Sequence, residues 1–153
     1  KERFGHTVGL ASDGEQLPDE RNRVTLDSDV KDNYGLPVPR ITNVCFQNES
    51  AMVEAISRSH REILEAGGAR DIRVDKMVPG GSSHYLGTCR MGKNRERSVV
   101  NSECRTHDVP NLYIGDGSVF VTGAAVNPAL TISALAARTA EGILAAFRRG
   151  EFS

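Results

Sequence analysis

The sequence predicts a mixed α and β fold, α/β with α+β character, for a chain of 153 residues. Three observations predict it: a β-branched run at residues 23–26, a helical apolar period over residues 49–66, and a second helix that opens at Asn127-Pro128. The composition, with 39% hydrophobic and 25% charged residues, is that of a globular protein. A chain of this length can bury a core of its own.

Extended segments are predicted before the first helix. Arg23–Leu26 has the pattern of a short strand, which the turn-forming run Asp27–Asp29 should close. A second turn is expected at Asp32–Gly35. The extended segment that follows, residues 36–44, carries prolines that suit the start of a strand or a sheet edge.

The clearest predicted helix covers residues 49–66, because its apolar side chains recur on one broad face. Asn48 or Ser50 can cap its start, and Gly67-Gly68 should end it. A short strand is expected next, at Asp71–Val74.

The second half of the chain begins with a loop, residues 79–101, that is rich in Gly, Ser and charge. The apolar run Asn111–Gly115 predicts a compact buried strand. Asn127 is a favoured N-cap and Pro128 a favoured first helical residue, so a helix should follow and reach Phe147. Its small and apolar residues predict close packing on several sides, as in a helix inside a larger protein.

Charge and cysteine content exclude several classes of protein. The 19 basic and 20 acidic residues give a net charge of −1, which offers no electrostatic attraction to nucleic acid. No apolar stretch is expected to approach the roughly 18–20 residues of a membrane span, so no membrane segment is predicted. Cys45, Cys89 and Cys104 are odd in number and form no Cys-x-x-Cys pair, which favours a reducing compartment over a disulfide framework.

Two segments could carry chemistry. His84 lies in the loop GSSHYLGTCRMG, residues 81–92, and could be a general base, because an imidazole changes protonation near neutral pH. It could equally be a loop histidine without a chemical role, and the residue alone leaves both interpretations open. Residues 114–118, followed by the helix at Pro128, could form an anion site from glycine turns and helical N–H groups; an ordinary strand–loop–helix connection has the same pattern.

A zinc site is a further candidate. His84 and Cys89 are separated by four residues, and Cys104 and His107 by two, so the four could form a Cys₂His₂ set. A structural zinc normally fixes a small unit, whereas a long helix of core-like composition follows here. A small zinc-binding structural or interaction module is therefore the alternative interpretation.

Several motifs stand in a fixed order along the chain: His84–Gly92, Ser98–Asn101, Val109–Phe120 and Asn127–Ile132, preceded by Arg23–Leu26 and Asp32–Pro37. In order and spacing they resemble the C-terminal part of the glucose–methanol–choline (GMC) flavoprotein oxidoreductases. The resemblance covers roughly residues 20–148.

The resemblance implies a two-part fold, in which an FAD-binding α/β domain is interleaved with a substrate domain built on an antiparallel sheet. Residues 1–81 would be part of the substrate-binding domain. Residues 82–153 would be the active-site loop and the C-terminal segment of the FAD-binding domain.

The resemblance also implies roles for individual residues. His84 matches the family's catalytic base at the flavin ring, and Asn127 matches the second active-site position. Gly115 and Asp116 would lie along the FAD phosphates and ribityl chain. Pro128 and Thr131, together with Asn127, would lie at the pyrimidine edge of the flavin.

The implied function is FAD-dependent oxidation of an alcohol, such as a sugar, a polyol or another CH–OH substrate, by hydride transfer to flavin N5. The family's dinucleotide fingerprint, Gly-x-Gly-x-x-Gly after a strand, occurs nowhere in the sequence. The chain is therefore expected to be the C-terminal portion of an enzyme. An N-terminal FAD-binding portion, or a companion chain, would complete the cofactor site.

Overall fold

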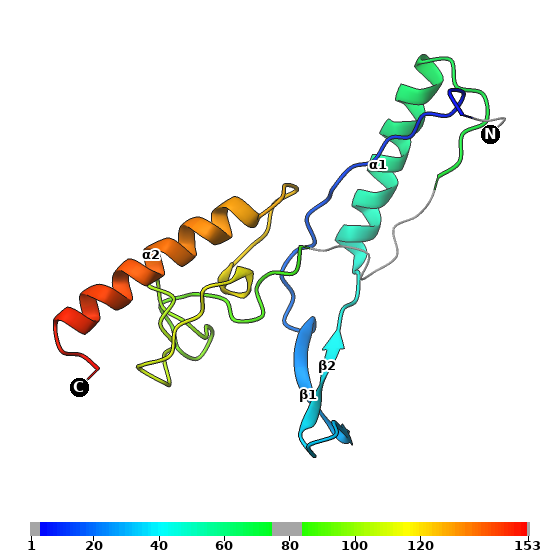
Figure 1. Cartoon of the computed structure of the whole chain (residues 1–153). Coiled ribbons are helices and arrows are strands. Elements are labelled where there is room, and N and C mark those ends of the chain that lie inside the picture. Colours follow the sequence, from blue (N-terminus) through cyan, green and yellow to red (C-terminus); the bar gives the residue numbers. More distant parts are fainter. Residues whose placement is uncertain (1–3, 75–83, 153) are drawn as a thin grey trace.

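The computed structural model describes residues 4–74 and 84–152 (Figure 1). Its elements are β1 (Arg23–Lys31), β2 (Pro37–Thr42), α1 (Gln47–Ala66), the 3₁₀ helix η1 (Gly117–Val119) and α2 (Ala129–Arg148). Within these residues β1 and β2 form a two-stranded antiparallel sheet. The predicted mixed α and β class is confirmed.

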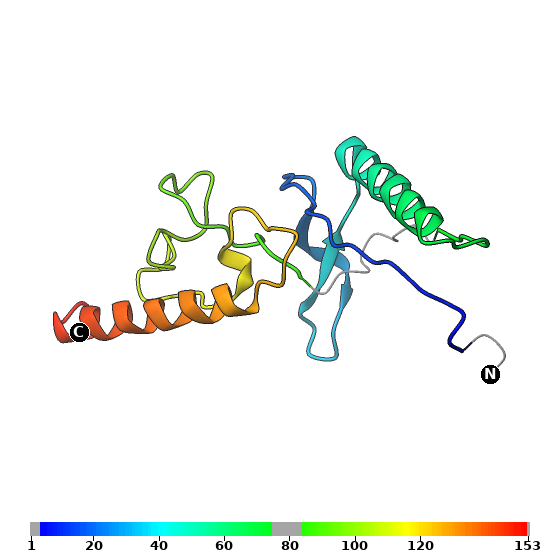
Figure 2. The ribbon, with the colours of Figure 1, turned by 90° about the horizontal axis from the view of Figure 1, so that it is seen from above.

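The elements fall into two groups. The hairpin β1–β2 and α1 lie on one side of the molecule, and α2 lies on the other with the loops that precede it (Figures 1 and 2). The boundary expected between the two domain segments, at residues 81 and 82, lies outside the described residues. The division of the chain at that point stays a prediction.

The first strand is longer than expected. Arg23–Leu26 is confirmed as extended, but the expected end at Asp27–Asp29 is wrong, because β1 continues to Lys31. The Asp27 side chain instead makes a local turn inside the strand. Its Oδ1 accepts hydrogen bonds from the N–H groups of Asp29 (2.9 Å) and Val30 (3.0 Å), and the pairing register with β2 shifts in this stretch.

The turn between the strands follows the sequence prediction. Asp32 Oδ1 accepts hydrogen bonds from the N–H groups of Tyr34 and Leu36, both at 2.9 Å. Gly35 adopts φ 81°, a conformation that costs glycine little. These bonds reverse the chain, so that β2 returns along β1 with Arg23 opposite Thr42.

Helix α1 is confirmed, but its predicted caps are wrong. It begins at Gln47 with Phe46 in the N-cap position. The Glu49 carboxylate accepts a hydrogen bond from the Phe46 N–H (2.8 Å), which is half of a capping box. Ser50 donates its hydroxyl to the Phe46 carbonyl and so cannot cap the amides, and Asn48 donates its side-chain amide to Glu49.

The predicted end of α1 is confirmed, but the short strand predicted after it is not formed. The helix stops before Gly67-Gly68 as expected, and Gly68 takes the left-handed conformation with φ 83°. The strand expected at Asp71–Val74 is wrong, because residues 72–74 have no regular secondary structure.

The apolar run Asn111–Gly115 does not form the expected strand. Only an isolated bridge joins Arg105 to Tyr113, and Leu112 is 49% exposed. The backbone of this stretch bonds to turns instead: the Leu112 carbonyl accepts from the Thr106 N–H, and the Ile114 N–H donates to the Cys104 carbonyl, both at 2.9 Å. The stretch is a loop that closes on the preceding turn.

A small apolar core lies beneath these loops. Val100, Cys104 and Val119 are fully buried, and four partly buried side chains pack against them: Met91, Ile114, Phe120 and Leu135. The last of these belongs to α2, so the core attaches that helix to the loops. The three cysteines, Cys45, Cys89 and Cys104, are free thiols.

Helix α2 is confirmed with a shift at its start. Pro128, and not Asn127, occupies the N-cap position, and its side chain makes no capping hydrogen bond. Its outer surface is strongly apolar and uncovered: Leu130 is 84% exposed and Phe147 is 69% exposed. The close packing expected on several sides is therefore absent from the part of the chain described here.

The expectation that no apolar stretch approaches the length of a membrane span is wrong for α2. This helix has 20 residues and a mean hydropathy of 1.3 in its most apolar window, of which 11% is buried. By length and composition it is long and apolar enough to cross a membrane. One such helix is weak evidence for a span, because core helices of soluble proteins have the same properties. The Arg138 guanidinium, in the middle of α2, donates to the Ser102 carbonyl.

Candidate active site

The loop that carries His84 runs beside η1 and is hydrogen-bonded to it. The N–H groups of Gly87, Cys89 and Met91 donate to consecutive carbonyls, those of Gly117 (3.3 Å), Ser118 (2.9 Å) and Val119 (2.9 Å). Alternate residues of one segment thus contact successive residues of the other. The structure therefore joins two of the motifs noted in the sequence, His84–Gly92 and Val109–Phe120.

Leu86 fixes this arrangement through its side chain. A Cβ atom added to Gly117 would lie 2.6 Å from Leu86 Cδ2 and 3.0 Å from Ile132 Cδ1, and one added to Gly123 would lie 3.3 Å from Leu86 Cδ1. Leu86 thus packs against Gly117 and Gly123, and Ile132 of α2 packs against Gly117 as well. Gly87 follows with φ 85°. Small residues at these positions let the histidine loop approach the start of α2 closely.

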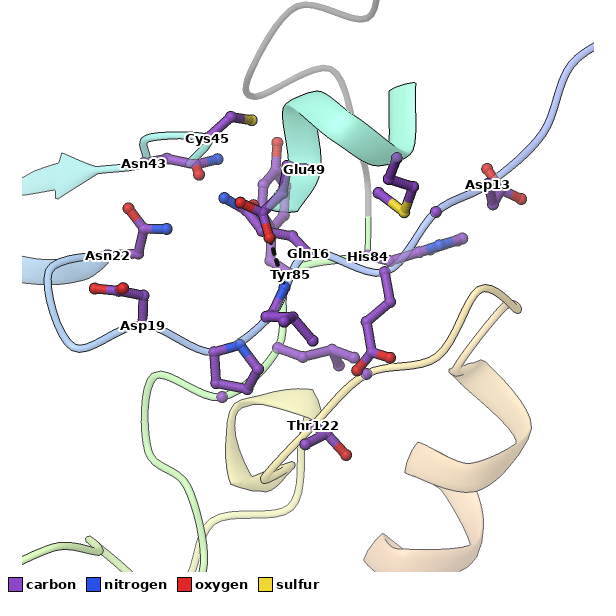
Figure 3. A pocket seen from close by; sticks show the side chains of 18 of the residues that line it. Asp13, Gln16, Asp19, Asn22, Asn43, Cys45, Glu49, His84, Tyr85 and Thr122 are labelled. Carbon is purple, nitrogen blue, oxygen red and sulfur yellow. Dashed lines mark hydrogen bonds between the residues drawn. The ribbon is translucent and has the colours of Figure 1, made fainter. Parts of the chain in front are cut away.

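A cleft of about 1890 Å³ lies between the two parts of the molecule. One side is formed by residues 84–88 and 120–124, together with Arg90, and the other mainly by residues 13–24 and the first turns of α1. Figure 3 shows Glu49 on the α1 side of the cleft, Thr122 on the loop before α2, and His84 in the lining. His84 is half-buried there. A half-buried imidazole in the lining can contact a small molecule bound in the cleft.

Asn127 is exposed, and the cleft lining ends before it, at Ala124. The loop that carries Asn127 continues directly from the lining residues into α2. The meeting of the His84 imidazole and the Asn127 carboxamide at one ligand therefore stays a prediction.

The remaining predicted cofactor residues lie around η1 and the start of α2. The Asp116 carboxylate caps η1 by accepting a hydrogen bond from the Ser118 N–H (2.8 Å). Hydrogen bonds from Ser118 hold the pKa of Asp116 below its ordinary value, so this exposed group is an anion at neutral pH. Gly115 and Thr131 are exposed as well. Their contact with a cofactor stays a prediction.

The four residues of the zinc alternative do not form a metal site. Among the described residues, which include all four, no group of three or more His, Cys, Asp or Glu side chains is arranged to hold a metal ion. Cys104 is fully buried in the apolar core. The His107 imidazole is hydrogen-bonded within the protein, to Ser98 Oγ (3.1 Å) and the Gly92 carbonyl (3.2 Å). The zinc interpretation is withdrawn on these grounds.

Sequence reasoning missed Glu49, a buried carboxylate in the cleft lining. Only 5% of this residue is exposed, and it accepts hydrogen bonds from the N–H groups of Phe46 (2.8 Å) and Leu17 (3.2 Å). The signal that could have found it is its spacing. Glu49 stands three residues after Phe46, the arrangement of a capping box.

Comparison with known proteins places the chain in a family. The C-terminal family model with the description GMC oxidoreductase matches residues 18–136. The chain belongs to the GMC oxidoreductase family. The resemblance drawn from the motifs is thereby confirmed.

Other members of the GMC family match nearly the whole chain. The 2-methyl-1,2-propanediol dehydrogenase of Mycolicibacterium austroafricanum is 42% identical over 143 residues, which are 93% of this chain and 26% of that protein. The fructose dehydrogenase large subunit of Gluconobacter japonicus is 34% identical and covers 98% of this chain and 27% of its own length. The chain thus spans about a quarter of the length of the curated relatives it matches.

Among solved structures, pyridoxine 4-oxidase from Mesorbium loti matches 56% of this chain and 21% of its own, with 27% identity. The TM-score is 0.38, too low to superimpose individual residues. No site residue is placed from it.

Proposed function

We propose that this chain is part of a longer FAD-dependent GMC enzyme that oxidises the CH–OH group of an alcohol, such as a sugar or a polyol. The observation that carries the proposal is the family match over residues 18–136, which includes the His84 loop, η1 and the start of α2. The names of the relatives support the reaction class, because one is a diol dehydrogenase and another a fructose dehydrogenase.

Uncovered apolar surface supports the view that further protein completes the fold. On α2, Leu130, Leu144 and Phe147 are each more than half exposed, and on the hairpin Leu26 and Ile41 are 71% and 73% exposed. Exposed apolar surface of this extent normally marks an interface. We assign it to the remaining FAD-binding portion of the enzyme or to a companion chain, which would also supply the missing dinucleotide fingerprint.

The start of α2 fits the cofactor edge that the family implies. Pro128 has no N–H group, and the first hydrogen bond inside the helix runs from Ile132 N–H to the Pro128 carbonyl. The amides of residues 129–131 therefore lack partners within the helix, and the Pro128 side chain does not cap them. Such N–H groups can donate to the carbonyl and nitrogen acceptors of a flavin pyrimidine ring. FAD, when bound, would supply the hydride acceptor, flavin N5.

His84 is the general base of the proposed reaction. An alcohol is too weakly acidic to ionise unaided, so the His84 imidazole would take the hydroxyl proton, and bound FAD would supply the acceptor for the carbinol hydrogen. Such assistance is typically worth about 10²–10⁴ in rate. The packing of Leu86 between Gly117 and Gly123 holds the backbone next to this imidazole in place. A fixed base satisfies the need for orientation in proton transfer.

Asn127 and α2 act beside the base. The Asn127 carboxamide can donate a hydrogen bond to the substrate oxygen and so orient the carbinol carbon. The N-terminus of α2 carries a partial positive charge, which would stabilise negative charge on a flavin bound with its pyrimidine edge at this helix end. This role explains why the first turn of α2 carries no acidic residue.

The proposal is tested by the absorbance spectrum of the full-length protein that contains this chain. We expect flavin bands, and their bleaching when a polyol is added without oxygen. A protein without flavin would contradict the proposal, and so would a flavin that no alcohol in a broad panel reduces.

A further inference from the structure

An extended segment, residues 12–18, is attached along α1 and forms one wall of the cleft. It has no regular secondary structure and runs beside the helix (Figure 1). Residues 13–18 of this segment line the same cleft as His84. Since no described strand pairs with this segment, its position depends on side-chain contacts with its neighbours.

Three of these contacts come from polar groups. The Ser12 hydroxyl is hydrogen-bonded to His60 Nε2 (2.7 Å) on α1, and the Gln16 side-chain amide donates to the Val44 carbonyl (2.9 Å). The third is the bond from Leu17 N–H to Glu49 Oε1 (3.2 Å). The first two are exposed, whereas Glu49 is buried. A hydrogen bond to a buried carboxylate contributes more to stability than an exposed one.

Glu49 uses both of its oxygens. Oε2 accepts from the Phe46 N–H at the start of α1, and Oε1 accepts from the Leu17 N–H in the segment. The carboxylate therefore joins the first turn of α1 to the cleft wall. A glutamine at this position keeps the size of the side chain but has one oxygen, so it can accept only one of the two bonds well.

Close packing next to Glu49 adds to the attachment. A Cβ atom added to Gly14 would lie 2.6 Å from Met52 Cε, so the backbone of the segment contacts the side chain of Met52 directly. Met52 is one turn further along α1 than Glu49, and both line the cleft. The segment and α1 thus present one continuous surface to whatever occupies the cleft.

We propose that Glu49 is a positioning residue for substrate binding: its buried carboxylate holds residues 12–18 in place as the cleft wall that faces the His84 loop. This inference rests on the proposed function, since it takes the occupant of the cleft to be the alcohol substrate. Glu49 does not contact the reacting atoms. It sets the shape of the cleft, and with it the affinity for substrate.

The test compares Glu49→Gln with Glu62→Gln, a matched control on the exposed surface of α1. In the full-length enzyme we expect Glu49→Gln to raise KM about three- to tenfold for the polyol that the wild type oxidises fastest, with kcat within about twofold. Hydrogen–deuterium exchange of residues 12–18 should become faster in this variant alone. An unchanged KM together with unchanged exchange would overturn the inference.

A second variant covers the case in which Glu49→Gln fails to fold. Gln16→Ala removes the bond to the Val44 carbonyl and leaves Glu49 intact, and it should shift KM and exchange in the same direction. If it shifts neither, the inference fails. If the wild type oxidises no polyol at all, the proposed function is what has failed, and the role of Glu49 in substrate binding fails with it; the exchange of residues 12–18 then tests only whether Glu49 holds this segment in place.

Discussion

Leu86 packs directly against Gly117, so that a Cβ atom at position 117 would lie 2.6 Å from Leu86 Cδ2. This contact joins the loop of the proposed base to η1 and, through Ile132, to the start of α2. The His84 loop and the start of α2 therefore both pack against position 117, where any side chain would meet Leu86 and Ile132.

Gly117→Ala should destabilise the protein by about 1–3 kcal/mol, because the added methyl overpacks a filled site. Thermal or urea unfolding of the full-length protein measures the change. Gly9→Ala is the matched control for stability, since no described atom lies within 4 Å of a Cβ atom added there. Equal stability of the two variants would show that the Leu86 contact does not constrain the loop.

Cys104 is expected to contribute to stability by packing and not to bind zinc. Because Cys104 is fully buried among apolar side chains, Cys104→Ala should cost about 1 kcal/mol through lost packing. Metal analysis should find no stoichiometric zinc in the wild type. Stoichiometric zinc that is lost in Cys104→Ser would restore the zinc interpretation.

The free energy of unfolding should depend on pH through Glu49. Burial raises the pKa of its carboxyl, but the N–H groups of Phe46 and Leu17 outweigh this effect and hold the pKa below the ordinary 4.5. The folded protein therefore binds this proton less tightly than the unfolded chain. The contribution is fully present above the unfolded value and is lost as the pH falls through the lower, folded value.

Unfolding experiments with the wild type and Glu49→Gln, over a pH range from about 3 to 7, measure this dependence. The variant should lose part of the slope of stability against pH in the acidic range. Identical slopes for the two proteins would show that Glu49 does not titrate with a lowered pKa.

Local patterns predicted elements better than they predicted how those elements pair. The helical period over residues 49–66 and the Asn-Pro start of α2 each lie within a few residues of the observed element, since both depend on neighbours along the chain. Asp27 has the pattern of a turn, and its side chain does bond the N–H group of Asp29, but pairing with β2 continues the strand past it to Lys31.

Long-range contacts explain what the sequence could not predict. The apolar run Asn111–Gly115 lacks a strand partner because its backbone closes on the turn before it. The bonds from the His84 loop to η1 join Gly87 to Gly117 and Met91 to Val119, which are far apart in the sequence, and no local signal predicts that these segments pair. The bond from Leu17 to Glu49 is also long-range, so only the spacing of Glu49 from Phe46 marks this residue in the sequence.

The most direct measurement of the central claim is the rate of anaerobic flavin reduction by substrate in His84→Ala, with His6→Ala as the control at an exposed histidine. We expect His84→Ala to keep its FAD and to reduce it at least about a hundredfold more slowly than the wild type, while His6→Ala is unchanged. A His84→Ala enzyme that binds FAD and is reduced at the wild-type rate would contradict the account.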